Sequence, residues 1–288
     1  MKRTISKDKA ALDRSQWLRT LMLILLSVLS LIPFYFMFVN ATHTSNEVKS
    51  GINLWFGSNL MQNLATFNQK QQGVGVTALQ SMLNSLKIAV PSTALSVYFS
   101  ALTAYGIHAY RFKGRKFAWS FILAVMMVPT QVFAVGFYKF MIQLDLIDTY
   151  WPLIIPSITT PAVVFFMRQY LQGALPMEMV EAARIDGSGE FQTFNRIVLP
   201  IMKPALATQA IFQFVATWNS LFMPSMIINS SEKKTLTMFV QMLMGDSFRT
   251  DYGVVFLALS ITILPMFVVY FILSRYIVEG VAIGSVKG

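Results

Sequence analysis

The chain has 288 residues, of which 55% are hydrophobic and 12% are charged, and its formal net charge is +10 at pH 7. Typical soluble domains carry about 25% charged residues, so this composition argues against a soluble globular protein. Cysteine is absent, which excludes disulfides and thiolate metal ligands, and we expect no metal site in the chain.

Six segments of the sequence lack Lys, Arg, Asp and Glu and are long enough to cross a membrane, since about 20 apolar residues span a bilayer core as a helix. The segments are Leu21–Val39, Ile88–Tyr110, Phe117–Tyr138, Tyr150–Met167, Pro204–Ser231 and Tyr252–Ser274. A large soluble protein with six buried helices of this length is the less favoured alternative. The sequence therefore predicts an all-α membrane protein with six transmembrane helices.

The first segment also fits part of the description of a cleaved signal peptide, because a basic leader precedes it. It is longer than the usual apolar region of such peptides, and Asn40-Ala41-Thr42 is a poor cleavage site, so we interpret it as an uncleaved span. The predicted organisation is a cytoplasmic N-terminal arm at 1–16, a first transmembrane helix at 17–39, an external loop at 40–78, a five-helix core at 79–278 that contains a cytoplasmic loop at 169–203, and a cytoplasmic tail at 279–288.

The orientation follows from Lys and Arg, because positively charged loops stay in the cytoplasm. Sixteen of the 23 Lys and Arg residues lie before the first span, after the second and fourth spans, or in the C-terminal segment, and six lie in the opposite loops. Lys87 lies at the outer end of the second span, where its long stem can reach the surface. Both termini are therefore predicted to be cytoplasmic, and this arrangement accounts for the positive charge without a nucleic-acid partner.

None of the 13 Asp and Glu residues lies within the six segments, whereas proton- or sodium-coupled carriers usually keep an ionisable or ion-coordinating group there. Neutral side chains in the third and fifth segments are candidates for lining a cavity, namely Gln131, Gln209, Gln213, Thr217, Trp218 and Asn219. Gln209 and Gln213 are four residues apart and share one helical face, which Thr217 continues. The alternative is that these groups form hydrogen bonds between helices.

The cytoplasmic loop at 169–203 is predicted to form two short helices joined by a bend. Pro176 fits the first position of the first helix, and Gly187 fits the residue that ends it. Ser188 can cap the second helix, which carries apolar side chains at three-residue spacing, namely Phe191, Phe194 and Ile197. Ala182 and Ala183 make a small-residue surface that another protein could approach closely. A simple amphipathic loop lying on the membrane is the alternative.

The same loop matches, in residue type and spacing, the EAA motif of ATP-binding-cassette (ABC) importer permeases. The matching residues are Glu181, Ala182, Ala183, Gly187, Ile197, Leu199 and Pro200. Other patterns are similar to carbohydrate-importer permeases of the MalG type, namely Leu146–Tyr150, Arg168-Gln169, Ala183–Gly187 with its Asp186, Trp218-Asn219, Lys233–Leu236 and the ending Gly280–Gly288. The resemblance covers most of 79–288. Ser188 departs from it, because alanine is usual there.

This resemblance implies the transmembrane domain of a type I ABC importer in a bacterial or archaeal cytoplasmic membrane. In such importers two related permeases, here expected to be a heterodimer, enclose a central pathway, and an extracytoplasmic solute-binding protein delivers the sugar. Two ATPase subunits bind ATP and Mg, and the EAA loop resembles the coupling helix that lies in a cleft of the ATPase. The coupling residues implied are Glu181, Ala182, Ala183, Asp186, Gly187, Ile197, Leu199 and Pro200.

The C-terminal segment is also part of the resemblance, which implies that Val286, Lys287 and Gly288 reach the interface between the two ATPases. Gly280–Gly288 is glycine-rich and is not expected to form a stable helix. The chain lacks the G-x-x-x-x-G-K-[ST] phosphate loop, so we expect a transport subunit without its own ATP site or cofactor, and not an enzyme.

A sugar presents hydroxyls and apolar ring faces, so the amides of the fifth segment and Trp218 suit its recognition. Two alternatives stay open. The first is an ABC permease for a polyamine, phosphate or an amino acid, which the EAA motif alone permits. The second is a secondary carrier or a membrane enzyme, for which the only histidines, His43 and His108, lie near the predicted membrane edges.

Overall fold

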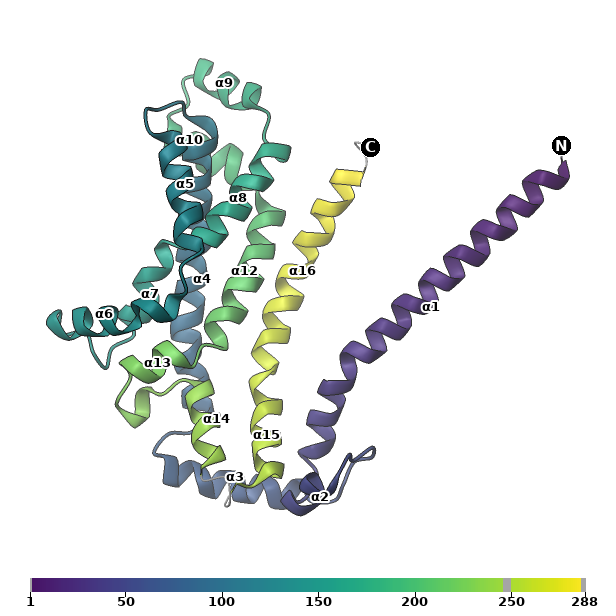
Figure 1. The fold of residues 1–288 in the computed structure, drawn as a ribbon, viewed down its shortest axis with the longest axis vertical. Helices are drawn as coiled ribbons and strands as arrows, with labels where there is room; N and C mark the ends of the chain where they lie inside the picture. Colours follow the sequence, from purple (N-terminus) through teal and green to yellow (C-terminus); the bar gives the residue numbers. More distant parts are fainter. Residues whose placement is uncertain (1, 246–249, 286–288) are drawn as a thin grey trace. The chain divides into compact units, whose positions relative to one another are not determined.

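The computed structural model describes residues 2–245 and 250–285, with side chains for 16–129, 131–245 and 250–276. Within these residues every regular element is helical and there is no strand. The chain divides into two compact units, one of 1–70 with 243–261 and the other of 71–242 with 262–288. The prediction of an all-α chain is confirmed for the described residues (Figure 1).

The first unit contains α1 (Lys2–Asn40), α2 (Ser45–Ser50), most of α3 (Leu60–Val74) and most of α15 (Tyr252–Thr262). The buried amide of Asn63 donates hydrogen bonds to the carbonyl oxygens of Ala41 (2.8 Å) and His43 (2.9 Å). A Cβ at Gly253 would lie 2.3 Å from the His43 oxygen, so only glycine fits where α15 approaches this turn. By contrast, the apolar side chains of α1 are exposed from Trp17 through Phe34, as expected of a helix that faces lipid or another subunit.

The second unit is built on two long helices, α4 (Ala78–Ala109) and α12 (Lys203–Trp218), which pack against each other. The other elements of this unit are α5 (Arg115–Met126), α6 (Thr130–Gln143), α7 (Trp151–Ile154), a 3₁₀ turn (Ile155–Ile158), α8 (Pro161–Ala174), α9 (Met177–Ile185), α10 (Glu190–Thr193), a π-helical turn (Phe194–Val198), α11 (Leu199–Ile201), α13 (Phe222–Ile227), a 3₁₀ turn (Ser231–Lys233), most of α14 (Leu236–Met244) and α16 (Leu264–Ser285). In Figure 1, α9 lies at one end of this unit and α13 toward the other.

Close helix packing in the second unit depends on small residues of α4. Ser92, Ser96, Ser100 and Ala104 are buried on this helix, and α4 packs against both α8 and α12. The Ser96 hydroxyl donates a 2.9 Å hydrogen bond to Thr160 Oγ1 just before α8. Small residues that let backbones approach, with hydroxyls bonding between helices, are typical of helix packing in membranes.

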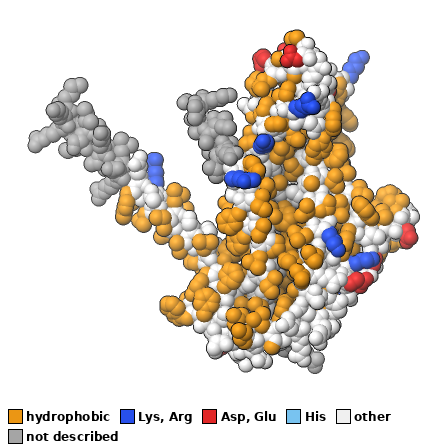
Figure 2. Space-filling model, turned by 180° about the vertical axis from the view of Figure 1, so that it is seen from behind, with side chains coloured by type: hydrophobic (Ala, Val, Ile, Leu, Met, Phe, Trp, Pro, Cys, Tyr) orange, Lys and Arg blue, Asp and Glu red, His pale blue; other side chains and the backbone are white. Residues whose placement is uncertain are grey.

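Four helical segments are long and apolar enough to cross a membrane, namely Gln16–Asn40, Ala78–Ala109, Trp151–Ala174 and Tyr252–Tyr276. Two further candidates are bent pairs, and counting each pair as one span gives up to six. Figure 2 shows hydrophobic side chains over much of the visible face, with few charged side chains among them. The chain is therefore a multi-pass membrane protein, as the sequence predicts.

The third predicted span, Phe117–Tyr138, is not one continuous helix. Its two halves, α5 and α6, meet at an angle of 98°. Pro129 lies at the break and precedes the first residue of α6. Proline has no N–H to donate and disfavours a helical residue before it, so the bend falls where the sequence places the proline.

The C-terminal segment also differs from the prediction, because α16 continues as a helix to Ser285. Gly280 and Gly284 are separated by Val281, Ala282 and Ile283, and α16 is already formed when the chain reaches them. Extending an existing helix avoids the cost of nucleation, which outweighs the poor helix propensity of two glycines.

Candidate functional site

The loop predicted to couple to a partner contains helix α9. This helix is terminated at Gly187, as the sequence predicts. The Gly187 N–H donates to the Arg184 carbonyl (3.1 Å), and the Ser188 N–H donates to the Ala183 carbonyl (2.9 Å). Gly187 has φ +79°, a left-handed conformation that glycine adopts without a steric penalty. Pro176 is the N-cap of α9, and the helix begins one residue later than predicted, at Met177.

The two faces of α9 have different surroundings. Val180 is fully buried and Ala183 is only 5% exposed, so both face the protein interior. Glu181 and Ala182 are exposed, and Ile185 is 86% exposed. The predicted small-residue surface is therefore wrong for Ala183, whose small side chain lets α9 pack on its own chain, and only Ala182 lies on the outer face. Asp186 and Gly187 are exposed at the end of this face.

The inner face of α9 is part of one hydrophobic cluster that continues into the long helices. The cluster consists of Val97, Ala101, Ala104, Tyr105, Ala109, Val163, Val164, Met167, Leu171, Leu175, Val180, Phe194, Val198 and Met202. These residues come from α4, α8 and the residue after it, α9, the π-helical turn and the residue before α12. Because packed interiors are dense, this cluster joins α9 to α4, α8 and the start of α12 as one packed interior.

The segment after the bend differs from the sequence prediction. Gly189, not Ser188, is the N-cap of α10, and the Ser188 hydroxyl instead accepts a 2.9 Å hydrogen bond from Thr193. Phe194 is fully buried, whereas Phe191 is two-thirds exposed, so the two rings do not share a face. The π-helical turn that begins at Phe194 then changes the residue period between Phe194 and Ile197, which a three-residue spacing rule does not anticipate. Three predicted coupling residues follow: Ile197 and Leu199 are partly buried and Pro200 is exposed.

A polar cluster missed by the sequence analysis holds the bend between α9 and α10. The Arg184 guanidinium contacts Glu190 Oε1 at 2.7 Å, and the Tyr105 hydroxyl donates to Glu190 Oε2 at 3.1 Å. The Arg184 guanidinium also lies 5.4 Å from the ring centroid of Tyr110. The hydrogen bond from Arg184 holds the pKa of the Glu190 carboxyl below its ordinary value. The bend is therefore anchored to the end of α4 by a charged pair as well as by apolar packing.

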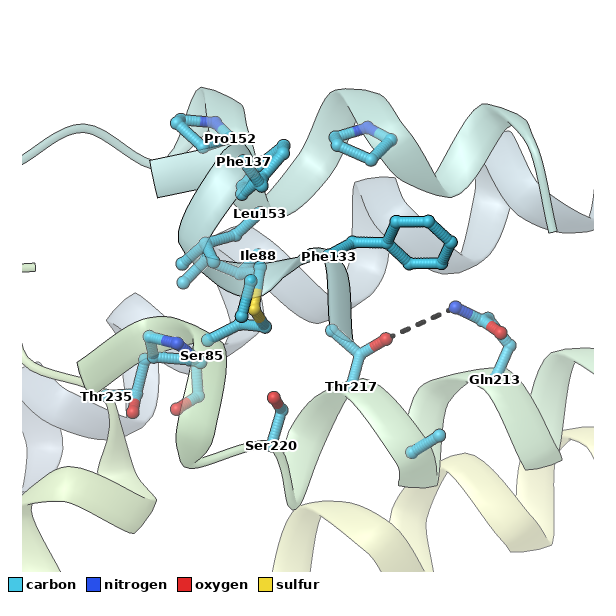
Figure 3. Close-up of a pocket in the computed structure, with 15 residues that line it drawn as sticks. Ser85, Ile88, Phe133, Phe137, Pro152, Leu153, Gln213, Thr217, Ser220 and Thr235 are labelled. Atoms are coloured by element: carbon cyan, nitrogen blue, oxygen red, sulfur yellow. Dashed lines mark hydrogen bonds between the residues drawn. The ribbon is translucent and has the colours of Figure 1, made fainter. Parts of the chain in front are cut away.

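A cavity of about 550 Å³ lies toward the other end of the second unit. Its walls come from α4, α6, α7, α12 and α13, and the lining residues are Ser85, Ile88, Phe133, Ala134, Phe137, Pro152, Leu153, Pro156, Gln213, Ala216, Thr217, Ser220, Met223, Pro224 and Thr235. No charged side chain is among them. Figure 3 shows Gln213 and Thr217 projecting from α12, with Gln213 Nε2 donating to Thr217 Oγ1 at 3.4 Å and Phe133 across from them.

The structure thus brings two of the six predicted cavity residues together. Trp218 is 2% exposed, stacks on Phe214 and donates from Nε1 to the Thr262 carbonyl at 3.2 Å, so its ring is used in helix packing. The remaining three are outside the lining: Gln209 is buried, and Gln131 and Asn219 are exposed. The sequence analysis missed the apolar wall made by Phe133 and Phe137. These two residues follow Pro129 and are four residues apart, which places them on one face of α6.

Residues 96–283 match the family described as binding-protein-dependent transport system inner membrane component. That match covers more than half of the chain. This chain belongs to that family. The family includes the membrane-embedded permeases of ABC transporters, and this permease carries the EAA motif of Glu181–Pro200 within the matched region.

The permease is similar to two proteins of named substrate. It is 33% identical to the arabinooligosaccharides transport system permease protein AraQ of Bacillus subtilis, with 93% of this chain and 95% of AraQ covered. It is 32% identical to the lactose transport system permease protein LacG of Rhizobium radiobacter, with 91% and 93% covered.

The fold of the permease is similar to a chain in the crystal structure of a bacterial ABC transporter involved in the import of the acidic polysaccharide alginate. The TM-score is 0.73 at 21% identity, and 90% of this chain and 95% of that chain are covered. The tail residues Val286, Lys287 and Gly288 lie outside the described residues.

Proposed function

We propose that this permease is the transmembrane subunit of an ABC importer that moves a neutral sugar or oligosaccharide into the cell, with energy from separate ATPase subunits. The observation that carries this proposal is the continuity between α9 and the cavity. The helices α4 and α12 supply Ser85, Gln213 and Thr217 to the cavity, and the hydrophobic cluster under α9 includes α4 and ends at Met202, next to α12.

The mechanism follows from that continuity. The ATPase contacts the exposed face of α9 at Glu181, Ala182 and Ile185, and its closure on ATP displaces the helix. Val180 passes the displacement to the cluster, because its side chain is buried within it. The ends of α4, α8 and α12 move, and the cavity between α4, α6 and α12 changes its opening. In this way ATP hydrolysis by a partner is converted into movement of a solute pathway.

The chemistry of the lining selects the class of solute. The amide of Gln213 and the hydroxyls of Thr217 and Ser220 can exchange hydrogen bonds with sugar hydroxyls, and Phe133 and Phe137 offer apolar surface for ring faces. A charged solute would need an opposite charge, and the lining residues include none. Transport of a neutral sugar agrees with the named substrates of AraQ and LacG, whereas alginate is acidic.

The assembly contains further subunits. A second, homologous permease completes the pathway, two ATPase subunits bind ATP and Mg beneath the paired α9 helices, and an extracytoplasmic solute-binding protein delivers the sugar. The family description as binding-protein-dependent supports the last of these. The excess of Lys and Arg in one set of loops supports cytoplasmic termini and six spans, with α5 and α6 counted as one bent span and α12 as the span that follows the cytoplasmic coupling loop.

Isolation of the assembly from native membranes tests the proposal. The permease carrying an affinity tag should co-purify with a second permease and an ATPase, and the ATPase activity of this complex should rise with a sugar-loaded binding protein. Purification of the permease with neither subunit, under conditions that keep its own fold, would contradict the proposal.

A further inference from the structure

The turn between α4 and α5 gathers cations at the end of the second unit where α9 lies (Figure 1). The cationic residues are Arg111, Lys113, Arg115 and Lys116. A cavity of about 970 Å³ is lined by His108, Ala109, Tyr110, Arg111, Arg115, Gln172, Met177, Glu181, Arg184 and Glu190. A second depression, of about 520 Å³, is lined by residues 111–116. Arg111 and Arg115 belong to both linings, so they lie where the two cavities adjoin.

The cations of this turn form no salt bridge in the described part of the chain. Glu190 is paired with Arg184, and the other ion pair in the described part of the chain joins Lys233 to Asp148. Arg111 and Arg115 therefore have no acidic partner among the described residues. The Arg115 guanidinium donates a long hydrogen bond, 3.4 Å, to the His108 carbonyl. The buried His108 Nε2 has no hydrogen-bond partner among the described residues. The lining carries three arginines against two carboxylates, one of which, Glu190, is paired with Arg184, and this net positive charge favours an anion with several oxygen acceptors.

An apolar surface begins directly beside the cations. Phe112 and Phe121 are exposed and Phe117 is 76% exposed. The rings of Phe117 and Phe121 stack with their centroids 6.2 Å apart, along α5 and away from the turn. Cations at the membrane surface next to exposed apolar side chains on a membrane helix match the two parts of a phospholipid, which are the phosphate headgroup and the acyl chain.

We propose that Arg111 and Arg115 bind the phosphate of an anionic phospholipid of the inner leaflet, with an acyl chain lying along Phe117 and Phe121. The placement in the inner leaflet rests on the cytoplasmic orientation proposed above. The lining of the same cavity includes Met177, Glu181 and Arg184 of α9, and the Arg184 guanidinium attracts a phosphate whereas the Glu181 carboxylate repels one. A bound headgroup braces the coupling helix, and coupling to the ATPase therefore depends on anionic lipid as well as on ATP.

Native mass spectrometry of the purified full chain tests the site without any transport partner. The chain is released from detergent after incubation with equal amounts of phosphatidylglycerol and phosphatidylcholine. We expect preferential retention of phosphatidylglycerol, which the double variant R111Q/R115Q lowers by roughly fivefold per arginine. The single variant Arg111→Gln should lower the retention by about half as much on a logarithmic scale. Because Arg111 is exposed, this variant is expected to fold normally, which separates loss of lipid from a folding defect.

The matched control is R196Q/K203Q, which removes two exposed cations from the same side of the chain but outside both cavities. This variant should retain phosphatidylglycerol as the wild type does. Equal retention by wild type and R111Q/R115Q, or equal loss in the control, would overturn the site. Displacement of the lipid by millimolar inorganic phosphate would overturn the lipid assignment in favour of a soluble phosphate compound. None of these outcomes depends on whether the permease transports sugar.

Discussion

Asp148 and Lys233, which are 85 residues apart in the sequence, form a salt bridge with 2.8 Å between Lys233 Nζ and Asp148 Oδ2. Lys233 also donates to the Asp148 carbonyl at 2.7 Å. Asp148 accepts hydrogen bonds from the backbone N–H groups of Asn229 and Ser230, each at 2.9 Å, and from the Ser230 hydroxyl. The patterns Leu146–Tyr150 and Lys233–Leu236, which the sequence shows as separate family features, are thus two halves of one contact.

This contact fixes the loop beside the cavity. The Tyr150 hydroxyl donates to the Lys233 carbonyl at 3.1 Å, and Asn84 of α4 donates to the carbonyls of Glu232 (2.8 Å) and Lys234 (3.1 Å). The next residue, Thr235, lines the cavity. The salt bridge therefore holds the rim of the proposed pathway against α4.

Replacement of Asp148 by Asn should lower the free energy of unfolding by about 1–2 kcal/mol, and with it the unfolding midpoint, because hydrogen bonds to a charged group are lost from a partly exposed pair. Asn tolerates the positive φ of this position, +59°, so backbone strain does not contribute. The measurement is the unfolding midpoint of the purified chain in detergent. Asp145→Asn is the matched control, since Asp145 is exposed and also has positive φ, +55°. An equal effect of both variants would contradict the role of the salt bridge.

The same variant should show a defined pH dependence. Burial alone raises the pKa of Asp148, but the hydrogen bonds from Lys233 and Ser230 outweigh it and hold the pKa well below its ordinary value. A lowered folded-state pKa stabilises the protein above the unfolded pKa of about 3.9, and this contribution is lost as the pH falls through the folded value. The stability difference between wild type and Asp148→Asn should be constant from about pH 8 to about pH 5 and shrink below about pH 4. A difference that grows on acidification would contradict this assignment.

Gly187→Val should weaken coupling without preventing membrane insertion. The left-handed φ of Gly187 costs a non-glycine residue roughly 1 kcal/mol or more, and a branched side chain would also project from the surface offered to the ATPase. The measurements are co-purification with the ATPase and uptake by intact cells. Gly189→Ala is the control, because Gly189 has φ −66° and a Cβ there meets no atom within 4 Å. Normal uptake with Gly187→Val would show that the bend is not part of coupling.

Ile185→Glu should weaken ATPase association tenfold or more while leaving the fold of the permease unchanged. Ile185 is 86% exposed on the outer face of α9, so a charge costs nothing in the isolated chain but opposes burial in an apolar cleft. Association is measured by titrating the purified ATPase against the permease. Leu144→Glu, at an exposed position after α6, is the matched apolar-to-acid control and should bind normally. Unchanged association of Ile185→Glu would remove Ile185 from the interface.

Gln213→Ala and Thr217→Val should each change the apparent affinity for sugar by about two- to tenfold, the range expected for one hydrogen bond. Both side chains line the cavity, whereas Thr208, earlier on α12, donates to the Pro204 carbonyl and does not. Thr208→Val is therefore the control. Concentration-dependent uptake measures the affinity, and thermal stability of the complex is measured alongside. Loss of stability with unchanged sugar preference would assign Gln213 and Thr217 to helix packing instead.

Much of the fold could be predicted because membrane helices leave strong signals. Four of the six long uncharged segments coincide with long apolar helices, and Gly187 follows the end of α9 as glycine chemistry requires. Features that depend on non-local packing were harder to predict from the sequence. Ala183 is small because α9 packs on its own chain, and Trp218 is buried because Phe214 and the Thr262 carbonyl lie beside it. Neither packing environment can be predicted from the residue type alone.

The lining of the cavity shows the same limit. Gln213 and Thr217 follow from the helical period of one segment, but Phe133 reaches the cavity only because the chain bends by 98° around Pro129. The proline is visible in the sequence, whereas the direction of the bend is not. The pairing of Asp148 with Lys233 likewise needs both loops in place, since no periodic pattern links residues so far apart.

Solute uptake by the assembled complex in liposomes tests the central claim most directly. The complex purified with the tagged permease is reconstituted with ATP and Mg on the ATPase side, and a saturated binding protein is supplied on the other. A panel of neutral oligosaccharides, acidic oligosaccharides and phosphorylated polyols is compared. The account predicts ATP-dependent accumulation of a neutral sugar and none of the charged solutes. Preferential accumulation of a charged solute, or accumulation driven by an ion gradient without ATP, would contradict it.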